Sequence, residues 1–263
     1  MRDFYWKPCA DLLVHGEQQV APEAEEKYLN WIRQRAEHIP LQQLTGEQGF
    51  MGLTFNVNEH VLIPRQDTEI LVEEVLKELH DGMRVLDMCT GSGCILLSLL
   101  HYSNDCEGLG VDLSAEALEV AGRNVLKVLT PEKAEHAHFL QSDLFEKVEG
   151  KFEIIVSNPP YIASAEVEKL MPEVRDHEPR MALDGTEDGL YFYRRIIEEA
   201  GKHLVSSGML FFEIGYDQGQ AVSELMRTEG YCEVQVVQDY AGLDRVVFGT
   251  YVTVQPAPFA KSR

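Results

Sequence analysis

Several features that would mark a common class of protein are missing from this sequence. It has five cysteines among 263 residues, an odd number, and no two show the Cys-x-x-Cys spacing of a zinc or redox site. No apolar run reaches the length of a membrane-spanning helix, and no apolar signal-peptide core follows Met1. The sequence therefore predicts no metal site and no disulfide framework, and it favours a reducing cytoplasm as the location.

Basic side chains are scarce as well. The chain has 23 lysines and arginines against 44 aspartates and glutamates, which gives a formal net charge of −21. Nucleic-acid binding draws most of its affinity from basic residues that neutralise phosphates, so this charge disfavours a duplex-binding surface, although it leaves room for a local basic patch. We therefore expect a protein or small-molecule partner, no direct contact with nucleic acid and no membrane partner.

Apolar strands and amphipathic helices alternate along most of the chain. Repeated β-α units predict an α/β fold, in which helices cover both faces of a parallel sheet. A long polar loop is predicted over residues 162–188. The predicted strands are residues 83–88, 108–112, 136–141, 152–157, 209–214, 232–237 and 245–252, and the predicted helices are 94–102, a segment capped by Ser114, 190–204 and 218–227.

The N-terminal part has a different pattern. A helix is predicted from Pro22 to Ile39, and Pro40 ends it. A β-hairpin is predicted over residues 46–61, followed by a helix that Asp67 or Thr68 caps. The apolar stripe of the first helix consists of Tyr28, Leu29, Ile32 and Ala36.

A run of small residues follows the strand at 83–88, in Asp87-Met88-Cys89-Thr90-Gly91-Ser92-Gly93-Cys94. Small side chains let the backbone turn sharply and let a ligand approach the open carboxyl end of a sheet. The dinucleotide fingerprint would need a glycine three residues after Gly93, where this chain has Leu96. NAD or FAD binding is therefore disfavoured, and no Walker-type phosphate loop is present.

Acidic residues end the next two strands. Asp112 can accept hydrogen bonds from both ribose hydroxyls of a nucleoside-like cofactor, and Asp143 can accept one from an exocyclic amine. Taken alone, each residue fits an ordinary role at a helix N-terminus or in a turn at least as well.

The strand at 152–157 ends in Asn158-Pro159-Pro160-Tyr161. Neither proline has an N–H group, so strand pairing stops there. The stiff turn offers a carboxamide, backbone carbonyls and an aromatic ring, which together can hold a planar NH2 group. An ordinary strand-ending turn would use the same residues. Because acceptor-bearing motifs end four successive strands, we favour a binding site over four unrelated turns.

Class I S-adenosylmethionine-dependent methyltransferases carry motifs similar to Asp87-x-Cys89-x-Gly91-x-Gly93, Asp112, Gln141-Ser142-Asp143 and Asn158-Pro159-Pro160-Tyr161. The last motif resembles that of enzymes that methylate adenine N6 or glutamine amides. The resemblance implies a Rossmann-like sheet, S-adenosylmethionine as cofactor and S-adenosylhomocysteine as product. It also implies a cofactor site formed by Asp87, Cys89, Thr90, Gly91, Ser92, Gly93, Asp112, Leu113, Asp143, Leu144 and Asn158.

Flanking stretches narrow the resemblance to the peptide chain release factor glutamine-N5 methyltransferases, the HemK/PrmC group. The implied reaction is methylation of the glutamine side-chain amide in the Gly-Gly-Gln motif of class I release factors. The implied catalytic residues are Asn158, Pro159 and Tyr161, and Pro160 completes the substrate-binding turn. The similar stretches, which cover nearly everything from about Glu23 onward, include residues 40–46, 61–69, 178–179, 182–185, 188–190 and 244–247.

Other acceptors stay open at this point. A glutamine of a ribosomal protein would fit the same motifs. Adenine N6 in nucleic acid would also fit the turn at residues 158–161, but the charge of −21 disfavours it. A cofactor-binding adaptor without activity is disfavoured because the turn is intact.

The chain departs from the family pattern at several positions. Cys89 and Thr186 stand where the family has glycine, and Leu144 stands where an aromatic residue can cover the adenine. The N-terminal helical part also looks shortened, which bears on protein docking. We predict a substrate-docking subdomain at 1–45, a hairpin and linker helix at 46–80, a methyltransferase domain at 81–255 and a frayed tail at 256–263.

Overall fold

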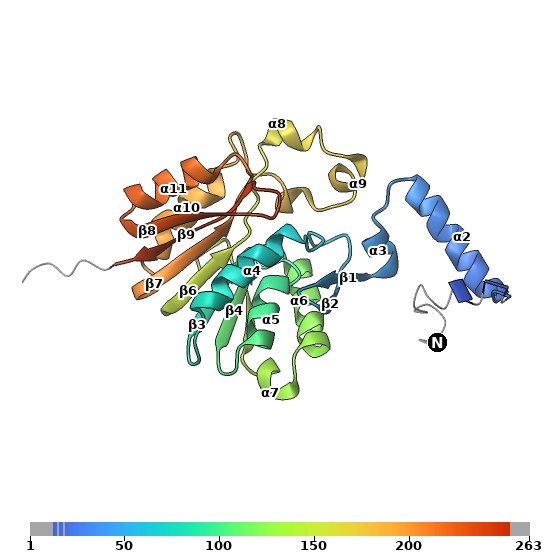
Figure 1. Cartoon of the computed structure of the whole chain (residues 1–263), viewed down its shortest axis with the longest axis horizontal. Helices are drawn as coiled ribbons and strands as arrows, with labels where there is room; N and C mark the ends of the chain where they lie inside the picture. The colour runs from blue at the N-terminus through green and yellow to red at the C-terminus, as the bar shows by residue number, and fades with distance from the viewer. Residues whose placement is uncertain (1–12, 15, 18, 253–263) are drawn as a thin grey trace, which may run out of the picture.

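The fold is a mostly parallel sheet between two layers of helices (Figure 1), seen in a computed structural model that describes residues 13–14, 16–17 and 19–252. The tail predicted to be frayed lies outside the described residues. The helices are α2 (Pro22–Ala36), α3 (Leu41–Thr45), α4 (Asp67–Glu78), α5 (Cys94–Tyr102), α6 (Ala115–Val128), α7 (Pro131–Ala134), α8 (Ser164–Val167), α9 (Pro172–Arg175), α10 (Tyr191–Ala200) and α11 (Gly219–Thr228), with a 3-10 turn, η2 (Arg180–Ala182).

The main sheet has seven strands in the order β5-β4-β3-β6-β7-β9-β8. Neighbours from β5 to β7 are parallel, and β9 is antiparallel to both β7 and β8. This arrangement confirms the predicted α/β class, with an antiparallel pair at one edge. The strands are β3 (Arg84–Met88), β4 (Glu107–Asp112), β5 (Ala137–Gln141), β6 (Phe152–Ser157), β7 (Leu204–Glu213), β8 (Tyr231–Gln238) and β9 (Asp244–Tyr251).

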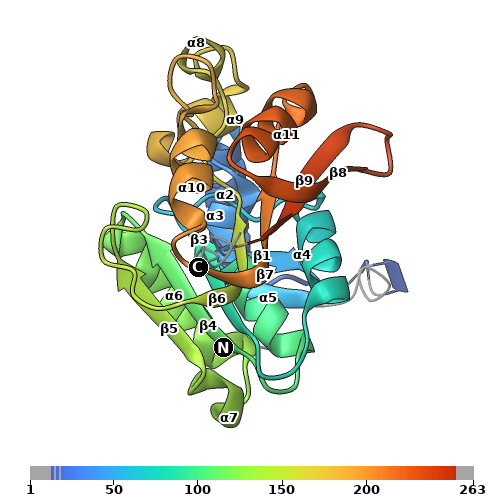
Figure 2. The ribbon, with the colours of Figure 1, turned by 90° about the vertical axis from the view of Figure 1, so that its left-hand side faces the viewer.

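The central strands bury side chains on both faces of the sheet. Ile154 and Val156 of β6 pack in the core beneath α4 and α5, whereas Ile155 points to the core beneath α10 and α11. Phe211 and Phe212 of β7 divide between the two cores in the same way. The two helical layers are visible on opposite sides of the sheet (Figures 1 and 2). Each buried apolar side chain contributes roughly 1.5–3 kcal/mol to the stability of the fold, so these strands form a rigid base for the loops at their ends.

The predicted hairpin forms a small separate sheet of β1 (Glu47–Phe50) and β2 (Leu53–Asn56). Its turn has positive φ at Met51 and Gly52, +50° and +71°, as a type I′ hairpin turn requires. Phe50 and Phe55 pack edge to face and are almost fully buried. The hairpin is therefore part of the core under α4 and α5 rather than a free flap.

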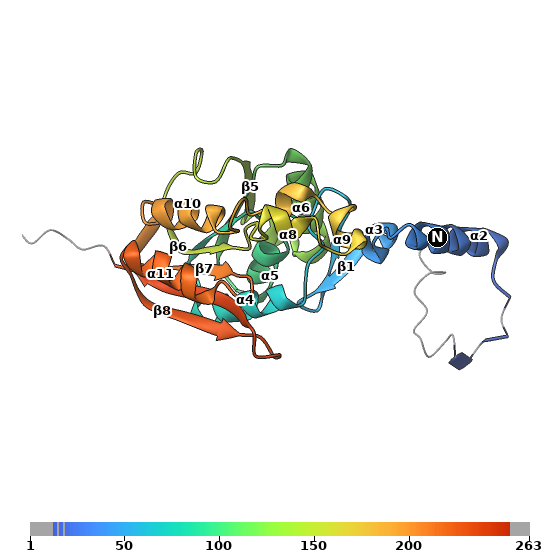
Figure 3. The ribbon, with the colours of Figure 1, turned by 90° about the horizontal axis from the view of Figure 1, so that it is seen from above.

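Helix α2 lies apart from the sheet and joins it through α3 (Figure 3). Its predicted apolar stripe does not pack into a core: Tyr28, Leu29 and Ile32 are 60%, 44% and 48% exposed, and no residue of α2 is buried. The helix ends at Ala36, before Pro40. Although α2 has 15 residues, none of the described helices has the length and apolarity to cross a membrane.

The predicted cap of α4 is wrong. Neither Asp67 nor Thr68 caps the helix with its side chain. Asp67 instead forms an ion pair with Arg245 at 3.2 Å, and the Thr68 hydroxyl accepts a hydrogen bond from Asn158. Both side chains have tertiary partners, which outweigh the local preference for capping.

Two further local predictions need correction. Leu204 does not continue the stripe of α10, because it begins β7 and pairs with Phe152. The segment at 162–188 is not a plain loop, since it contains α8, α9 and η2. Pro172 occupies the first position of α9, where proline favours the start of a helix. The polar composition of the segment had led to the prediction of a loop.

One buried amide connects the hairpin to the main domain, and its removal should destabilise the fold. Asn124 is fully buried, accepts from the Asn56 N–H at 2.7 Å, and donates to the carbonyls of Asn56 and Ser92 at 3.1 and 2.9 Å. An Asn124→Leu change would leave these backbone groups unpaired, and we expect it to lower the free energy of unfolding by about 3 kcal/mol. Urea denaturation measures this, with Asn104→Leu as an exposed control; equal stability of the two variants would contradict the prediction.

Candidate active site

Parallel pairing brings the ends of β3, β4, β5 and β6 to one edge of the sheet. Met88 is level with both Val111 and Ser157, and Asp112 is level with Gln141. The residues that follow each strand therefore lie side by side, although they are distant in the sequence. A cavity of about 220 Å³ lies at this edge. Among the predicted site residues, it is lined by Cys89, Thr90, Gly91, Ser92, Asp112, Leu113, Asp143, Leu144, Asn158 and Pro160.

Asp87 lies behind the glycine-rich loop and does not line the cavity. Its Oδ2 accepts from the Thr90 hydroxyl at 2.6 Å and from the Leu96 N–H at 3.3 Å, while Oδ1 has no partner among the described residues. Burial raises the pKa of this carboxyl from 3.8 to about 7, although the two hydrogen bonds oppose the shift. Gly93 also lies outside the lining, at the start of α5. Asp87 and Gly93 therefore support the conformation of the glycine-rich loop without lining the cavity.

Cys89 lines the cavity in a conformation that favours glycine. Its φ is +62°, in the left-handed region, which costs an L-residue roughly 1–2 kcal/mol. Glycine adopts this backbone conformation without that cost, so the position suits the glycine that the family resemblance implies. Burial raises the pKa of the thiol, so Cys89 is a neutral wall of the site.

Asp112 is held in place by backbone donors. Its Oδ2 accepts from the Gly91 N–H at 2.8 Å and its Oδ1 from the Ser114 N–H at 2.9 Å. Burial raises the pKa of the carboxyl, and these hydrogen bonds counteract that shift. Each carboxylate oxygen has a second lone pair, so Asp112 can still accept hydrogen bonds from a pair of hydroxyls.

Asp143 and Leu144 form the wall after β5. Asp143 Oδ1 accepts from Arg195 Nη1 at 2.9 Å, which leaves Oδ2 as the oxygen that can accept from a ligand. Leu144 is 4% exposed and has a φ of +45°. The ion pair with α10 thus orients the carboxyl, and the leucine gives an apolar surface beside it.

The turn after β6 presents the carboxamide of Asn158 to the cavity. Asn158 Nδ2 donates to Thr68 Oγ1 at 3.3 Å, and Oδ1 has no partner among the described residues. Pro159 and Pro160 are buried, but only Pro160 contributes to the lining. The amide oxygen of Asn158 is therefore the side-chain acceptor that this turn offers, and the backbone carbonyl of Pro159 has no partner among the described residues.

Tyr161 does not line the cavity, although the resemblance implies a catalytic role for it. Its hydroxyl donates to Glu213 Oε1 at 3.2 Å, and its carbonyl accepts from Gln218 Nε2 at 3.0 Å. Burial and the neighbouring Glu213 raise the pKa of the phenol. In this structure Tyr161 anchors the turn to β7 and to the start of α11.

The segment at 162–188 forms one rim of the cavity through Pro179, Met181, Ala182 and Asp184. Residues 183–185, where the segment returns, pack directly on the turn. A Cβ on Gly185 would lie only 2.8 Å from the backbone of residues 160–161. Backbone hydrogen bonds join Ile162 to Leu183 and Gly185 of this returning segment. The glycine is needed for this close approach.

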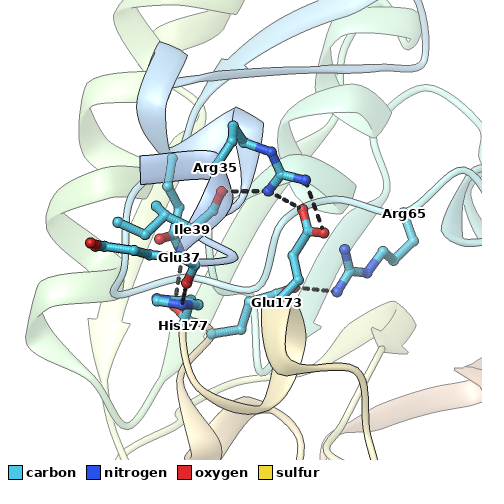
Figure 4. Close-up of polar contacts among 8 residues, drawn as sticks. Arg35, Glu37, Ile39, Arg65, Glu173 and His177 are labelled. Atoms are coloured by element: carbon cyan, nitrogen blue, oxygen red, sulfur yellow. Dashed lines mark hydrogen bonds and ion pairs between the residues drawn. The ribbon is translucent and has the colours of Figure 1, made fainter. Parts of the chain in front are cut away.

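The rim is also tied to the N-terminal helices (Figure 4). Arg35 binds Glu173 through two hydrogen bonds of 2.8 and 3.2 Å, and Gln43 Nε2 donates to the His177 carbonyl at 2.7 Å. The fully buried side chain of Glu178 accepts from Arg65 and from the Ile63 N–H. His177 therefore has a structural contact here rather than a position in the cavity.

Two residues that support the turn after β6 were missed from the sequence, as were several that line the cavity, among them Ala117, Met181 and Phe192. Thr68 and Glu213 are each 2% exposed and lie behind Asn158 and Tyr161. Thr68 was assigned to helix capping. Glu213 ends an otherwise apolar strand, which is the same signal that marked Asp87 and Asp112, so the pattern could have identified it.

A parallel sheet with a glycine-rich loop after its first strand, an acid after its second and Asn-Pro-Pro-Tyr after its fourth defines a class I methyltransferase. Residues 65–174 match the family described as "Methyltransferase small domain", and residues 6–46 match "PrmC N-terminal domain". The solved structure of a methyltransferase from Pyrococcus furiosus covers 84% of this chain and 99% of that one, with a TM-score of 0.57 and 18% identity, and supports the fold alone.

Curated relatives identify the family. The release factor glutamine methyltransferase of Clostridium acetobutylicum is 42% identical over 240 residues, 90% of this chain and 84% of that protein. The protein of the same name from Moorella thermoacetica is 45% identical over 238 residues, 89% of this chain and 83% of that protein. The chain belongs to the release factor glutamine methyltransferase family.

The buried carboxyl of Asp87 predicts a pH-dependent stability. Between pH 4 and 7 the folded protein holds a proton that the unfolded chain has released, so this contribution to stability is complete below pH 4 and is lost as the pH rises towards 7. Asp87→Asn mimics the protonated form at every pH. We expect the variant to gain stability relative to the parent protein across this range, by about 4 kcal/mol at most.

Urea denaturation at pH 4.5, 6 and 7.5 measures the difference, with Asp105→Asn as an exposed control. A difference between the Asp87→Asn variant and the parent protein that stays constant with pH would contradict the prediction.

Proposed function

We propose that the chain transfers a methyl group from S-adenosylmethionine to the side-chain amide nitrogen of the glutamine in the Gly-Gly-Gln motif of class I release factors. One observation carries the proposal: the carboxamide of Asn158 lines the cavity at the end of β6, with its NH2 group engaged by Thr68 and its oxygen available. An oxygen in this position accepts a hydrogen from a planar NH2 group.

The lining fits the proposed cofactor. Gly91 has no atom within 4 Å of the position of a Cβ, so a ligand can approach its backbone closely. Asp112 can accept from ribose hydroxyls and Asp143 Oδ2 from an adenine amine, while Cys89 and Leu144 add neutral surface. When bound, S-adenosylmethionine supplies a methyl group already activated on a positively charged sulfur.

The residues of the turn then prepare the acceptor nitrogen. A glutamine amide is a poor nucleophile because its lone pair is delocalised into the carbonyl. Asn158 Oδ1 accepts one amide hydrogen and the carbonyl of Pro159 the other, which directs the lone pair at the methyl group. Both hydrogen bonds strengthen as the nitrogen becomes positive, so they stabilise the transition state more than the bound substrate.

Proton loss needs no dedicated base in this scheme. The methylated nitrogen would release its proton to water after transfer, and S-adenosylmethionine would supply the methyl group, with S-adenosylhomocysteine as the product. Positioning supplies most of the rate, because the donor and acceptor atoms are held in line. Tyr161 contributes by fixing the turn through Glu213 and α11.

The N-terminal residues 1–45 fit a docking role for the release factor. The stripe of Tyr28, Leu29 and Ile32 is exposed on α2 and can contact a protein surface. The same segment is tied to the rim by Arg35 (Figure 4) and by Gln43. A docked protein would therefore present its glutamine beside the residues that border the cavity, in the cytoplasm where translation ends.

A release factor is favoured over the other acceptors. The curated relatives cited above are named for release factors, which speaks against a ribosomal protein. The net charge of −21 speaks against a nucleic-acid substrate, whose phosphates the chain would repel.

Mass spectrometry of a release factor incubated with the protein and S-adenosylmethionine tests the proposal. We expect a gain of one methyl group on the Gly-Gly-Gln glutamine and none on a matched release factor with glutamate at that position. A ribosomal protein fraction and DNA serve as competing acceptors in parallel reactions. Methylation of either one, with none on the release factor, would overturn the proposal.

The role of Asn158 gives a sharper prediction. Asn158→Ala removes the acceptor for one amide hydrogen, and we expect kcat to fall roughly 100- to 1,000-fold. Cofactor binding, measured by calorimetry, should stay within about twofold, since the acceptor side of the site is what changes. Asn104→Ala, on the surface, is the control. Normal turnover by Asn158→Ala would refute this mechanism.

A further inference from the structure

Arg65 lies in a stretch that resembles the family, residues 61–69, and the proposed mechanism gives this side chain no part. Among the described residues that line the cavity, Arg65 is the one lysine or arginine. We propose that its guanidinium group binds the α-carboxylate of S-adenosylmethionine, at the amino-acid end of the cofactor. This inference rests on the proposed function and deepens it.

The charges of the lining leave one partner for a carboxylate. The acids that line the cavity are Asp112, Asp143 and Asp184. They repel an anion, and an anion that leaves water needs an opposite charge or hydrogen-bond donors in its place. His60 also lines the cavity, but its ring lies 3.7 Å from the Glu59 carboxylate, and it is charged only when protonated. Arg65 is always charged, because a guanidinium group keeps its proton in proteins.

The order of the strands puts the amino-acid end of the cofactor on one side of the sheet edge. In the proposed function, Asp143 after β5 takes the adenine and Asp112 after the neighbouring β4 takes the ribose. Asn158 follows β6, on the far side of β3 from β4. The sulfur of the cofactor joins its ribose to its amino acid. A methyl group held near Asn158 therefore places the amino acid towards β3 and β6, away from the adenine.

The segment at residues 60–65 crosses the cavity to that same side. Val61 packs against α6, the helix that follows β4. Arg65 comes four residues later, just before α4. Thr68, in the first turn of α4, accepts a hydrogen bond from Asn158 at 3.3 Å. The segment therefore begins near the ribose side and brings Arg65 to the side of Asn158.

Glu178 fixes the guanidinium group without using all of its donors. Arg65 Nη2 donates to Glu178 Oε1 at 2.5 Å, and the Glu178 side chain is 1% exposed. Glu178 Oε2 accepts from the Ile63 N–H at 3.1 Å, which anchors the pair to the backbone of the same segment. The Arg65 side chain is 39% exposed and has no second acceptor among the described residues. Arginine has five N–H donors, so a second carboxylate can be bound through two of them.

Two ligands that differ only in the carboxylate test the inference without methyl transfer. S-adenosylhomocysteine carries this group, whereas its decarboxylated analogue keeps the adenosine, the sulfur and the amine. In Arg65→Gln we expect the affinity for S-adenosylhomocysteine, measured by calorimetry, to fall roughly 10- to 100-fold, because charge-assisted hydrogen bonds are lost. The affinity for the analogue should stay within about twofold. Arg123→Gln, exposed on α6, is the control and should bind both ligands as the parent protein does.

Three outcomes would overturn the inference. An equal loss of affinity for both ligands would mean that Arg65 only supports the fold through Glu178. Unchanged affinity for both ligands would mean that the carboxylate is bound elsewhere. A higher KM for the release factor, with unchanged affinity for S-adenosylhomocysteine, would assign Arg65 to the protein substrate instead.

The parent protein provides a test that does not depend on the folding of a variant. It should bind S-adenosylhomocysteine roughly 10- to 100-fold more tightly than the decarboxylated analogue. Equal affinities of the parent protein for the two ligands would contradict the inference. If the parent protein binds neither ligand, the proposed function fails instead, so the two failures are distinguishable.

Discussion

The parallel register of β3 with β4 and β6 is the constraint on which the site depends. It aligns the ends of strands whose loops are far apart in the sequence, so that a glycine-rich loop, two acids and a carboxamide border one cavity. The register is in turn imposed by side chains such as Ile154 and Ile155, which point alternately into two cores. A slip by one residue would exchange the two faces and disperse the site.

The turn at the end of β6 is held rigid by several elements. Pro159 and Pro160 cannot extend the strand pairing, and Gly185 allows the return segment to lie against the backbone of Pro160 and Tyr161. Tyr161 is directed away from the cavity and fixes the turn to Glu213. The stiffness of the turn therefore comes from several elements, which is consistent with catalysis by positioning.

Much of this could be predicted from the sequence, and the exceptions share a cause. Periodicity and proline placement located β6 and α5, and the resemblance located the cavity residues. Thr68 and Leu204 were misassigned because their contacts are with segments distant in the chain, which local patterns do not show. Glu213 could be recognised as an acid at the end of an apolar run. Its place beside the turn after β6 depends on β7 being the neighbour of β6, and only the sheet order shows that. The exposure of the stripe of α2 could not be predicted, because periodicity shows an apolar face without showing what covers it.

The most direct test of the account is a crystal structure of the protein with S-adenosylhomocysteine and a release factor that carries the Gly-Gly-Gln glutamine. The account predicts that the glutamine amide nitrogen lies about 3 Å from Asn158 Oδ1 and from the carbonyl of Pro159, within hydrogen-bond distance of both. A glutamine amide bound elsewhere in the cavity, or one that faces the NH2 group of Asn158, would contradict it.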